Sequence, residues 1–284
     1  RSGSSSADAC IPSDPGNYVP ADGAYFQTPC TPGHYQPSYG QTSCLDADAG
    51  YYVAVHGANS QITCGLGTFN PDTAQSSCTD ASAGHYVDTP ASTSQFACTA
   101  GTYNPSTGSS SAADCLPTDA GNYVPMAGAA AQIPCAAGSY QPSLGQASCI
   151  LADPGHYVPS EQSQTQSECL LGTFQAYSGS SSCSDAEPGH YVDSNGSSSQ
   201  TDCPPATYNP ATGSDDRDDC IDVEPGHYSD EWGAAEQLEC ALGTYQPNSG
   251  QMLCIGAASG HFVASSGATP QSACPAGTYR SEAR

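Results

Sequence analysis

The sequence predicts an all-β or irregular fold of small disulfide-rich repeats, stacked as β-hairpin units in an elongated, solenoid-like rod with very little helix. Two observations predict it: 16 cysteines recur at regular spacing, and a Gly-x-aromatic motif returns about every 17 residues. The composition agrees, because 30 glycines and 23 prolines among 284 residues leave little apolar material for one deep core.

The cysteines define a long period. Their gaps run 20, 14, 20, 14, 20 and 17 residues and then begin again, so that Cys10 corresponds to Cys115 and Cys220. Such self-similarity is the signature of a tandem array. We therefore expect a closing half-unit at 1–9, super-repeats at 10–114 and 115–219, and a partial third super-repeat at 220–284.

The Gly-x-aromatic motif defines the single unit, and only Ala206 replaces its glycine. Asn-Pro and Gln-Pro after the aromatic residue are turn chemistry, and helical periodicity is absent, so each unit should form two short strands. We expect the aromatic residue of each unit to stack on the next unit. These aromatic residues are Tyr18, Tyr35, Tyr52, Phe69, Tyr86, Tyr103, Tyr123, Tyr140, Tyr157, Phe174, Tyr191, Tyr208, Tyr228, Tyr245, Phe262 and Tyr279.

The units occur in two kinds. One contains two cysteines around Gly-Thr-Tyr or Gly-Thr-Phe, as at residues 64–78, and the other reads Pro-Gly-His-Tyr-Val and ends Gln-x-x-Cys, as at residues 154–169. In the second kind a small residue and a glutamine lie 14 residues apart, like the closest cysteine pairs. The small residues are Ala47, Ala81, Thr118, Ala152, Ala186, Val223 and Ala257, and the glutamines are Gln27, Gln61, Gln95, Gln132, Gln166, Gln200, Gln237 and Gln271.

This paired replacement bears on disulfide connectivity, since bonded cysteines are lost together. It favours bonds across the 14- and 17-residue gaps. The alternative joins cysteines across the 20-residue gaps and leaves no cysteine over, and the sequence alone does not decide between them. The favoured pairs are Cys30–Cys44, Cys64–Cys78, Cys98–Cys115, Cys135–Cys149, Cys169–Cys183, Cys203–Cys220 and Cys240–Cys254, which leave Cys10 and Cys274 as candidates for intermolecular bonds.

The pattern Cys-x-x-Gly-Thr-Tyr-x-Pro-x-x-Gly-x-x-x-Cys resembles the ephrin-receptor-like cysteine-rich repeat, a relative of tumour-necrosis-factor-receptor modules. The resemblance covers essentially the whole chain, although every second cysteine pair is absent. It implies that the first two cysteines bond across a small β-hairpin, as the shorter gaps suggest. Similar repeats occur in algal flagellar-hair (mastigoneme) proteins and in surface proteins of microbes.

Charge and cysteine usage exclude several functions. The net charge is −24, with no lysine and four arginines, so nothing can neutralise nucleic-acid phosphates or anionic lipids. Regular cysteines without a Cys-x-x-Cys motif indicate structural disulfides in an extracellular or cell-surface protein. Catalysis needs one unique constellation of residues, and a chain of near-copies offers none, so we expect neither an enzyme nor a cofactor.

Two repeated sets are candidate metal ligands. Histidines precede the aromatic residue, and acidic residues lie two positions before the Gly-x-aromatic motif. Calcium prefers such oxygen ligands, but no Asp-x-Asp-x-Asp-Gly loop is present, so we interpret both sets mainly as surface and turn residues. The histidines are His34, His85, His156, His190, His227 and His261, and the acids are Asp14, Asp48, Asp119, Asp153, Glu187 and Glu224.

The remaining candidates are glycosylation sites and aromatic residues that could contact a partner. Asn195-Gly196-Ser197 is an N-glycosylation sequon. Serine clusters at 109–111 and 180–182 suit O-glycans or plain loops. Departures from the repeat are scattered at Phe26, Tyr39, Tyr177 and Trp232, and Trp232 is the best single contact candidate.

These observations favour a structural subunit of an extracellular filament or cell-surface stalk over a receptor-like or adhesive ectodomain that binds protein or carbohydrate. Residues 3–10 match the closing half of a unit, and residues 274–279 match an opening half. We therefore expect head-to-tail joining through Cys10 and Cys274, or continuation of a longer chain. Three of the four arginines, Arg1, Arg280 and Arg284, would lie at such a junction and offset acidic repulsion.

Overall fold

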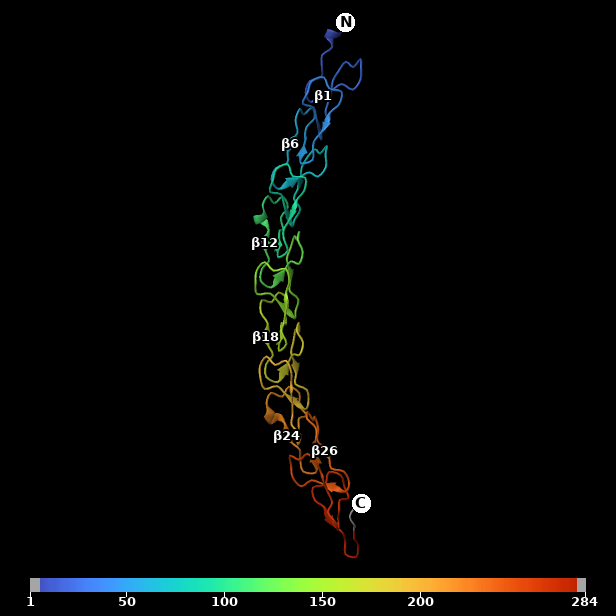
Figure 1. Ribbon diagram of the computed structural model, residues 1–284, viewed down its shortest axis with the longest axis vertical. Coiled ribbons are helices and arrows are strands. Elements are labelled where there is room, and N and C mark those ends of the chain that lie inside the picture. The colour runs from blue at the N-terminus through green and yellow to red at the C-terminus, as the bar shows by residue number, and fades with distance from the viewer. Residues whose placement is uncertain (1–5, 280–284) are drawn as a thin grey trace. The chain divides into compact units, whose positions relative to one another are not determined.

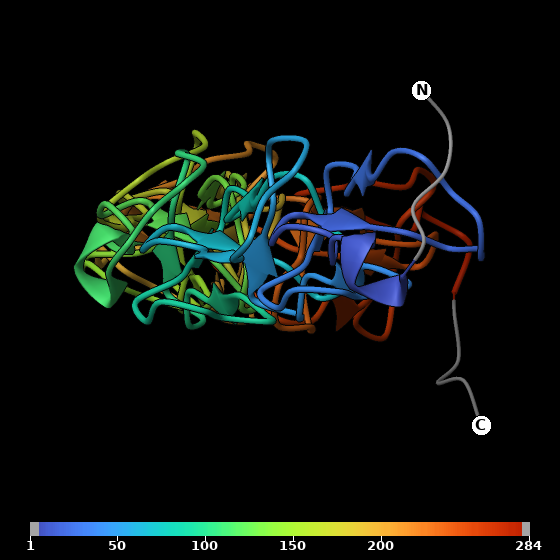
Figure 2. The same ribbon diagram turned by 90° about the horizontal axis from the view of Figure 1, so that it is seen from above.

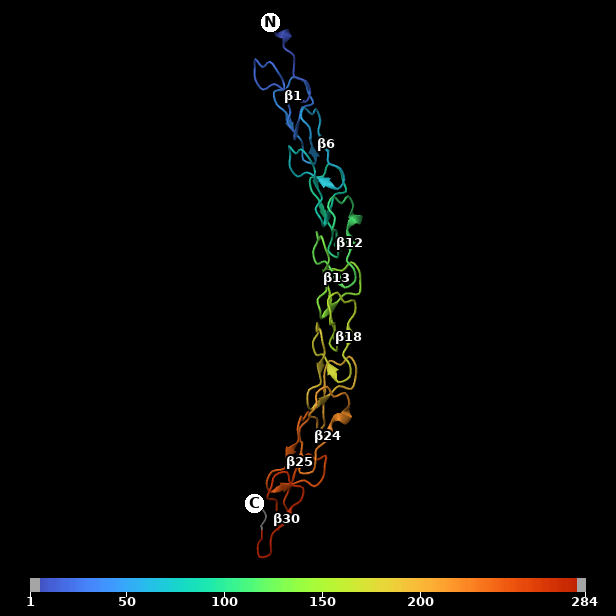
Figure 3. The same ribbon diagram turned by 180° about the vertical axis from the view of Figure 1, so that it is seen from behind.

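The computed structural model describes residues 6–279 and confirms small disulfide-rich β-hairpin repeats. The chain has two compact parts. One comprises the residues up to Pro134 together with Ser143–Cys149, and the other comprises Cys135–Pro142 together with the residues from Ile150. Each part is a succession of two-stranded antiparallel sheets with strands of two residues (Figure 1). Figure 3 shows the same hairpins from behind, and in Figure 2, seen from above, they overlap one another.

The hairpins of the first part pair consecutive strands. They are β1 (Asn17–Tyr18) with β2 (Thr28–Pro29), β3 (His34–Tyr35) with β4 (Leu45–Asp46), β5 (Tyr51–Tyr52) with β6 (Ile62–Thr63), β7 (Thr68–Phe69) with β8 (Thr79–Asp80), β9 (His85–Tyr86) with β10 (Phe96–Ala97), β11 (Thr102–Tyr103) with β12 (Leu116–Pro117), and β13 (Asn122–Tyr123) with β14 (Ile133–Pro134).

The second part continues in the same way. Its hairpins are β15 (Ser139–Tyr140) with β16 (Ile150–Leu151), β17 (His156–Tyr157) with β18 (Ser167–Glu168), β19 (Thr173–Phe174) with β20 (Ser184–Asp185), β21 (His190–Tyr191) with β22 (Thr201–Asp202), β23 (Thr207–Tyr208) with β24 (Ile221–Asp222), β25 (His227–Tyr228) with β26 (Leu238–Glu239), β27 (Thr244–Tyr245) with β28 (Ile255–Gly256), and β29 (His261–Phe262) with β30 (Ser272–Ala273).

Three short 3₁₀ turns complete the secondary structure of the described residues. They are η1 (Ala7–Ala9), η2 (Ala112–Asp114) and η3 (Arg217–Asp219), and each ends immediately before a cysteine. Their N-caps are Ser6, Ser111 and Asp216, whose side chains accept a backbone N–H inside the turn. The turns recur at the spacing of the super-repeat, although the boundaries at 10, 115 and 220 stay a prediction.

A tight turn begins each hairpin. In Thr31-Pro32-Gly33-His34 the His34 N–H donates to the Thr31 carbonyl at 3.0 Å, and Gly33 has φ +88°. Proline at the second position and a glycine of positive φ at the third define a type II turn. The Gly-x-aromatic motif is therefore a backbone requirement: the turn needs the glycine, and the strand starts one residue later.

Most hairpins bury two positions instead of contributing to one deep core, and the exceptions are half-buried at one of them, namely Val19, Gln175 and Ala257. The first position is the opening cysteine or its small replacement, and the second is the residue after the aromatic. Hairpins with a cysteine carry Asn or Gln at the second position, as Cys64 with Asn70. Hairpins without one carry Val, as Ala81 with Val87, except for β25–β26, which carries Ser229. Polar side chains are tolerated there because they are satisfied: Asn70 Nδ2 donates to the carbonyls of Tyr51 and Ser77.

Backbone hydrogen bonds join successive hairpins. Gly33 N–H donates to the Val53 carbonyl at 2.8 Å, and Gln36 N–H donates to the Ala58 carbonyl at 3.0 Å. Gly57 N–H in the loop of the later hairpin donates back to the Cys30 carbonyl at 2.8 Å. Equivalent bonds recur along each part, so neighbouring hairpins share one interface and stabilise one another.

The expected stacking of aromatic rings between units was wrong. Within residues 6–279 the ring contacts are Tyr25 with Phe26 and Tyr86 with Phe96, and the second lies inside one hairpin, at a centroid distance of 5.7 Å. Each aromatic residue instead pairs across the hairpin with the first residue of the second strand, as Tyr35 does with Leu45. The backbone bonds between hairpins take the place of the expected stacking.

Candidate functional site

Disulfides close alternate hairpins across the shorter cysteine gaps. The S–S distances lie between 1.89 and 1.95 Å, and the sequence separations are 14 or 17 residues. Cys135 and Cys149 are also disulfide-bonded. The six pairs with these distances and separations are Cys30–Cys44, Cys64–Cys78, Cys98–Cys115, Cys169–Cys183, Cys203–Cys220 and Cys240–Cys254.

A glutamine closes the hairpins that have no disulfide. Gln61 Oε1 accepts the Asp48 backbone N–H at 2.7 Å, and Gln61 Nε2 donates to Asp48 Oδ2 at 2.7 Å. Gln61 occupies the place of a closing cysteine, and Asp48 follows the buried Ala47 that occupies the place of an opening one. The same clamp joins Gln27 to Asp14, Gln132 to Asp119, Gln166 to Asp153, Gln200 to Glu187 and Gln237 to Glu224.

The acidic residues considered as calcium ligands are the partners in these clamps. One carboxylate oxygen of each already accepts a glutamine amide, at distances from 2.7 Å for Asp48 to 3.4 Å for Glu224. Between residues 6 and 279 no three His, Cys, Asp or Glu side chains form a group that could hold a metal ion. The clamp assigns these acids to hairpin closure, a role that the sequence interpretation missed.

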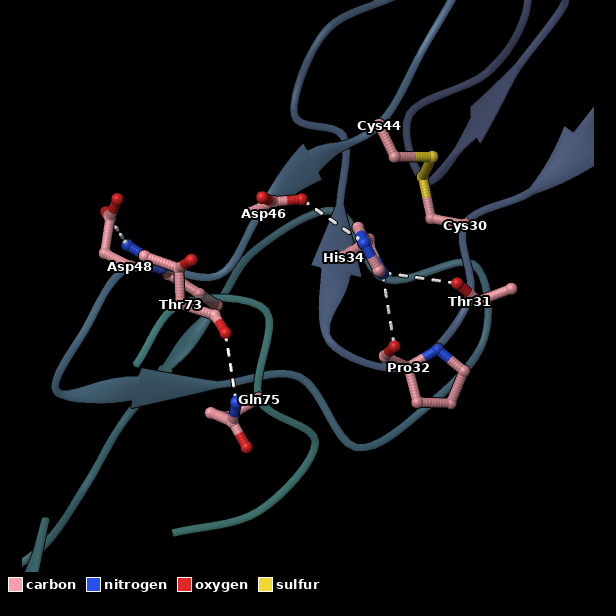
Figure 4. A network of polar contacts seen from close by, with 10 residues as sticks. Cys30, Thr31, Pro32, His34, Cys44, Asp46, Asp48, Thr73 and Gln75 are labelled. Carbon is pink, nitrogen blue, oxygen red and sulfur yellow. Dashed lines mark hydrogen bonds and ion pairs between the residues drawn. A yellow bond between two sulfur atoms is a disulfide. The ribbon is translucent and has the colours of Figure 1, made fainter. Parts of the chain in front are cut away.

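The six histidines of the candidate ladder lie on separate hairpins. Each contacts, through Nδ1, the carbonyl oxygen two residues earlier, at 3.0–3.4 Å. Nε2 of His34 lies 3.2 Å from Asp46 Oδ1, and Nε2 of His190 lies 3.0 Å from Asp202 Oδ1. Figure 4 shows His34 between Asp46 on one side and Thr31 and Pro32 on the other. The structure pairs these rings with a cross-strand residue and does not gather them.

The glycosylation candidates differ in accessibility. Asn195 is exposed, and its Oδ1 accepts the Leu171 N–H at 3.1 Å. Ser109 is buried and accepts a hydrogen bond from Asn104 Nδ2 at 2.7 Å, while Ser111 caps η2, so these two serines of the 109–111 cluster are structural. Ser180 Oγ donates to the Tyr177 carbonyl at 3.2 Å. Trp232 is exposed in the loop between β25 and β26.

The remaining candidates are two incomplete hairpins. Cys10 is a free, exposed cysteine that follows η1, as Cys115 follows η2. Ile11 occupies the position of Leu45, yet it is 88% exposed where Leu45 is 47% exposed, because no aromatic residue of the described chain lies opposite it. Residues 1–5 of the predicted closing half-unit lie outside the described residues.

The C-terminal half-hairpin is the opening half of a unit, whereas the N-terminal one is a closing half. Cys274 is the second free cysteine of the described chain, and Thr278 N–H already forms the usual turn with the Pro275 carbonyl at 3.0 Å. Tyr279 occupies the aromatic position and is 89% exposed, because residues 6–279 contain no closing strand opposite it. Arg1, Arg280 and Arg284 lie outside the described residues.

Fold and site together define a tandem array of closed β-hairpins, and such disulfide-bonded repeats are typical of an extracellular structural or binding ectodomain. No family model matches the chain, and no curated protein sequence is significantly similar to it. Along residues 6–279 there is no helix with the length and apolar character needed to span a bilayer.

Proposed function

We propose that the chain is a structural subunit of an extracellular filament or cell-surface stalk, in which the terminal half-hairpins are completed by a second copy joined head to tail or by continuation of the same repeats in a longer chain. The observation that carries the proposal is the complementarity of two half-hairpins. Within residues 6–279 Ile11 has no aromatic residue opposite it and Tyr279 has no second strand opposite it; Ile11 follows the free Cys10, and Tyr279 comes five residues after the free Cys274. Every complete hairpin of the described chain pairs these two positions, as Tyr35 pairs with Leu45.

Pairing the halves would repeat a geometry that the chain already uses. A two-residue strand ending at Tyr279 would lie antiparallel to Ile11-Pro12, and a Cys274–Cys10 bond would span the hairpin as Cys203–Cys220 does. Two thiols lose two electrons and two protons in forming this bond. In an oxidising compartment a small-molecule disulfide accepts them and leaves as two thiols.

Such a contact is heterologous, because the surface used on one copy differs from the surface used on the next. After two copies join in this way, each still has one free end, so that further copies can add and a fibre can grow. The resemblance to ephrin-receptor-like repeats agrees with a role in an extended surface structure. The proposal assigns the chain no catalytic role and no cofactor, and its partner is either another copy of itself or the continuing repeats of a longer chain.

Electrophoresis without reductant tests the proposal on oxidised, purified chain. We expect a ladder in multiples of 28.8 kDa that collapses to one band with dithiothreitol. Peptide mapping should recover a Cys10–Cys274 linkage, and Cys10→Ser should leave no band beyond a dimer. A single monomer band, or linkages joining Cys10 to Cys10, contradicts head-to-tail joining.

Decoration by sugar at Asn195 forms part of the proposal. The amide oxygen of Asn195 is held by the Leu171 N–H, and the side chain is exposed, so its nitrogen is available to a transferase. A glycan there would keep the Leu171 bond, since N-linkage leaves the oxygen an acceptor. A mass shift of the peptide containing Asn195, removed by an amidase specific for N-glycans, is the expected result for material from its native source.

A receptor-like or adhesive ectodomain is the second candidate, and one observation favours it. Trp232 is 66% exposed and follows Asp230 and Glu231 in the same loop. Tryptophan is enriched at interaction hot spots, and the neighbouring carboxylates would select a basic partner. Loss of cell-surface adhesion in Trp232→Ala, with filaments unchanged, would support this second function.

A further inference from the structure

Two kinds of closure lie in series along the backbone. The Cys30–Cys44 disulfide closes one hairpin, and the clamp between Gln61 and Asp48 closes the next. The Cys64–Cys78 disulfide closes the hairpin after that. Figure 4 shows the first disulfide, and Asp48 a few residues farther along the chain. A force that pulls on the two ends of the chain therefore passes through covalent and polar closures in turn.

Each disulfide bypasses the residues that it encloses. Tension that reaches Cys64 crosses the S–S bond to Cys78, and the segment between these two cysteines carries none of it. The Cα atoms of the pair are 5.8 Å apart at a sequence separation of 14, whereas a chain of that length extends to about 45–50 Å. The disulfide hairpins therefore keep this length hidden for as long as the S–S bond is intact.

The clamp hairpin holds its segment by non-covalent contacts. Gln61 forms the two hydrogen bonds to Asp48, and the Cys64 N–H donates to the Gly50 carbonyl at 3.0 Å beside the β5–β6 pairing. The flanking cysteines, Cys44 and Cys64, are both bonded into other hairpins. Hydrogen bonds can be exchanged for bonds to water, so this hairpin opens under a load that leaves the S–S bonds intact.

The same closure recurs in every hairpin of the described chain that lacks a disulfide. In each of them a glutamine Oε1 accepts the backbone N–H of the residue 13 positions earlier, at 2.7–2.8 Å. These bonds are exposed, so water has access to both partners when a hairpin opens. Segments of one length are therefore held in the same way along each part.

The packing between hairpins makes each opening a discrete event. The loop of a disulfide hairpin lies on the turn glycine of the disulfide hairpin two places earlier, so that an added Cβ on Gly33 would lie 2.2 Å from the Ala74 carbonyl oxygen. Clamp hairpins pack on each other in the same way, with 2.0 Å between a Cβ on Gly16 and the Gly57 carbonyl oxygen. Lengthening the chain at β5–β6 must therefore break the clamp and separate the Ala74 loop from Gly33 together.

We propose that the chain is a reversible extensible element, in which the clamp hairpins open one by one under tension and the disulfides limit the total extension. The inference rests on the proposed function, because a filament or stalk carries tension along its length, and adds a mechanical role to it. When the tension falls, each opened segment has only to close a loop of about 13 residues between hairpins that are still closed covalently, which is a fast step.

Single-chain force spectroscopy tests the inference on the full oxidised chain, with a handle at each end. We expect one step for each clamp hairpin, and recovery of the steps on relaxation. Each step should add about 40–60 Å of contour length, because 13 residues separate the clamp partners and 20 separate the flanking cysteines. Dithiothreitol should increase the final extension about twofold, since the disulfides enclose nearly half of the chain between Cys30 and Cys254.

Two variants change the number of steps in opposite directions. Ala47→Cys/Gln61→Cys replaces one clamp by a disulfide, and should remove one step when oxidised and restore it when reduced. Cys64→Ala/Cys78→Gln imitates the clamp hairpins and should add one step at the same total chain length. Gln61→Ala is the matched control, which should lower the force of one step and keep the number of steps.

Equal final extension of the oxidised and reduced chains would overturn the inference, and so would a full set of steps in the oxidised Ala47→Cys/Gln61→Cys variant. Rupture of each part in one event, without separate steps, would overturn it as well. The measurement uses one chain and needs no assembly. If copies form no ladder but the steps appear, head-to-tail joining fails and the extensible element stands, whereas a ladder without steps refutes the extensible element alone.

Discussion

The side-chain amide of Gln61 holds both the backbone N–H and the carboxylate of Asp48, each at 2.7 Å. The clamp lies where the next hairpin has a disulfide between Cys64 and Cys78. A reversible polar clamp and a covalent bond therefore alternate at the same place along the array. The clamp spans 13 residues and the disulfide 14, because the longer glutamine side chain reaches past the buried small residue to the residue after it.

This equivalence predicts that a clamp can be converted into a disulfide. In Ala47→Cys/Gln61→Cys the new cysteines occupy places equivalent to Cys30 and Cys44, whose Cα atoms are 5.9 Å apart. We expect a bond to form without a change of fold. Closing a loop of about 15 residues should stabilise the hairpin by about 3 kcal/mol, less about 1 kcal/mol for each hydrogen bond lost.

Free-thiol titration and native-state hydrogen exchange of the β5–β6 hairpin measure the two effects. Gln61→Ala alone is the control and should lower local stability by about 1–2 kcal/mol. Two free thiols in the oxidised double variant, with hairpins otherwise unchanged, would contradict the equivalence of clamp and disulfide.

The paired replacement in the sequence identified which hairpins lack a disulfide, because cysteine pairs and Ala/Gln pairs keep the same spacing. It did not identify the partner of the glutamine. Asp48 was assigned to a solvated turn because the sequence does not show that a side-chain amide reaches a backbone N–H. Likewise, Ser109 was interpreted as either an O-glycan site or a plain loop residue, although it is buried beside Asn104.

The packing between hairpins was the least predictable feature. The contact between Gly33 and Ala74 joins residues two hairpins apart and is made by backbone atoms, so no side-chain pattern marks it. In the sequence the motif glycine only marked the repeat, and its left-handed turn conformation was not predicted. Its second role, the absence of a Cβ beneath a neighbouring carbonyl, needs coordinates.

Alanine substitution of two motif glycines separates these roles. Gly67 and Gly243 have similar φ angles of +80° and +84°. A Cβ on Gly67 would lie 2.2 Å from the Gly108 carbonyl oxygen, whereas a Cβ on Gly243 would have no atom within 4 Å. Gly243→Ala should cost about 1–2 kcal/mol for the left-handed conformation. Gly67→Ala should cost about 1–3 kcal/mol more, because the overlying loop must move. Hydrogen exchange on each hairpin checks this, and equal losses would show that the close approach is unimportant.

Ala206 provides the reverse experiment. It is the motif position without glycine, and its backbone has φ +72°. Ala206→Gly should therefore stabilise the β23–β24 hairpin by about 1 kcal/mol, through relief of left-handed strain. The measurement is the local opening free energy from hydrogen exchange, with Gly196→Ala at φ +69° as an opposite-sign control. A loss of stability in Ala206→Gly would show that the left-handed conformation of Ala206 does not strain the hairpin.

Val223 and Ser229 are an exchanged pair in the β25–β26 hairpin. Comparable hairpins bury a small residue and a valine, as Ala186 and Val192 do, whereas here the valine comes first and the small residue second. Both are at most 2% exposed, so their combined volume is close to that of the usual pair. Ser229 Oγ is the buried side-chain oxygen or nitrogen that has no hydrogen-bond partner within the described chain.

Two effects can therefore be separated at this hairpin. Ser229→Ala keeps the volume, removes the unsatisfied hydroxyl and should stabilise the hairpin by about 1 kcal/mol. Ser229→Val adds volume beside Val223 and should destabilise the hairpin by about 1–3 kcal/mol, while Val223→Ala alone opens a cavity at a cost of about 2 kcal/mol.

The double variant Val223→Ala/Ser229→Val recreates the usual pair and should be at least as stable as the unaltered hairpin. Local hydrogen exchange of all four chains gives the coupling free energy, and simple additivity of the two single changes would show that the residues do not share one packed volume.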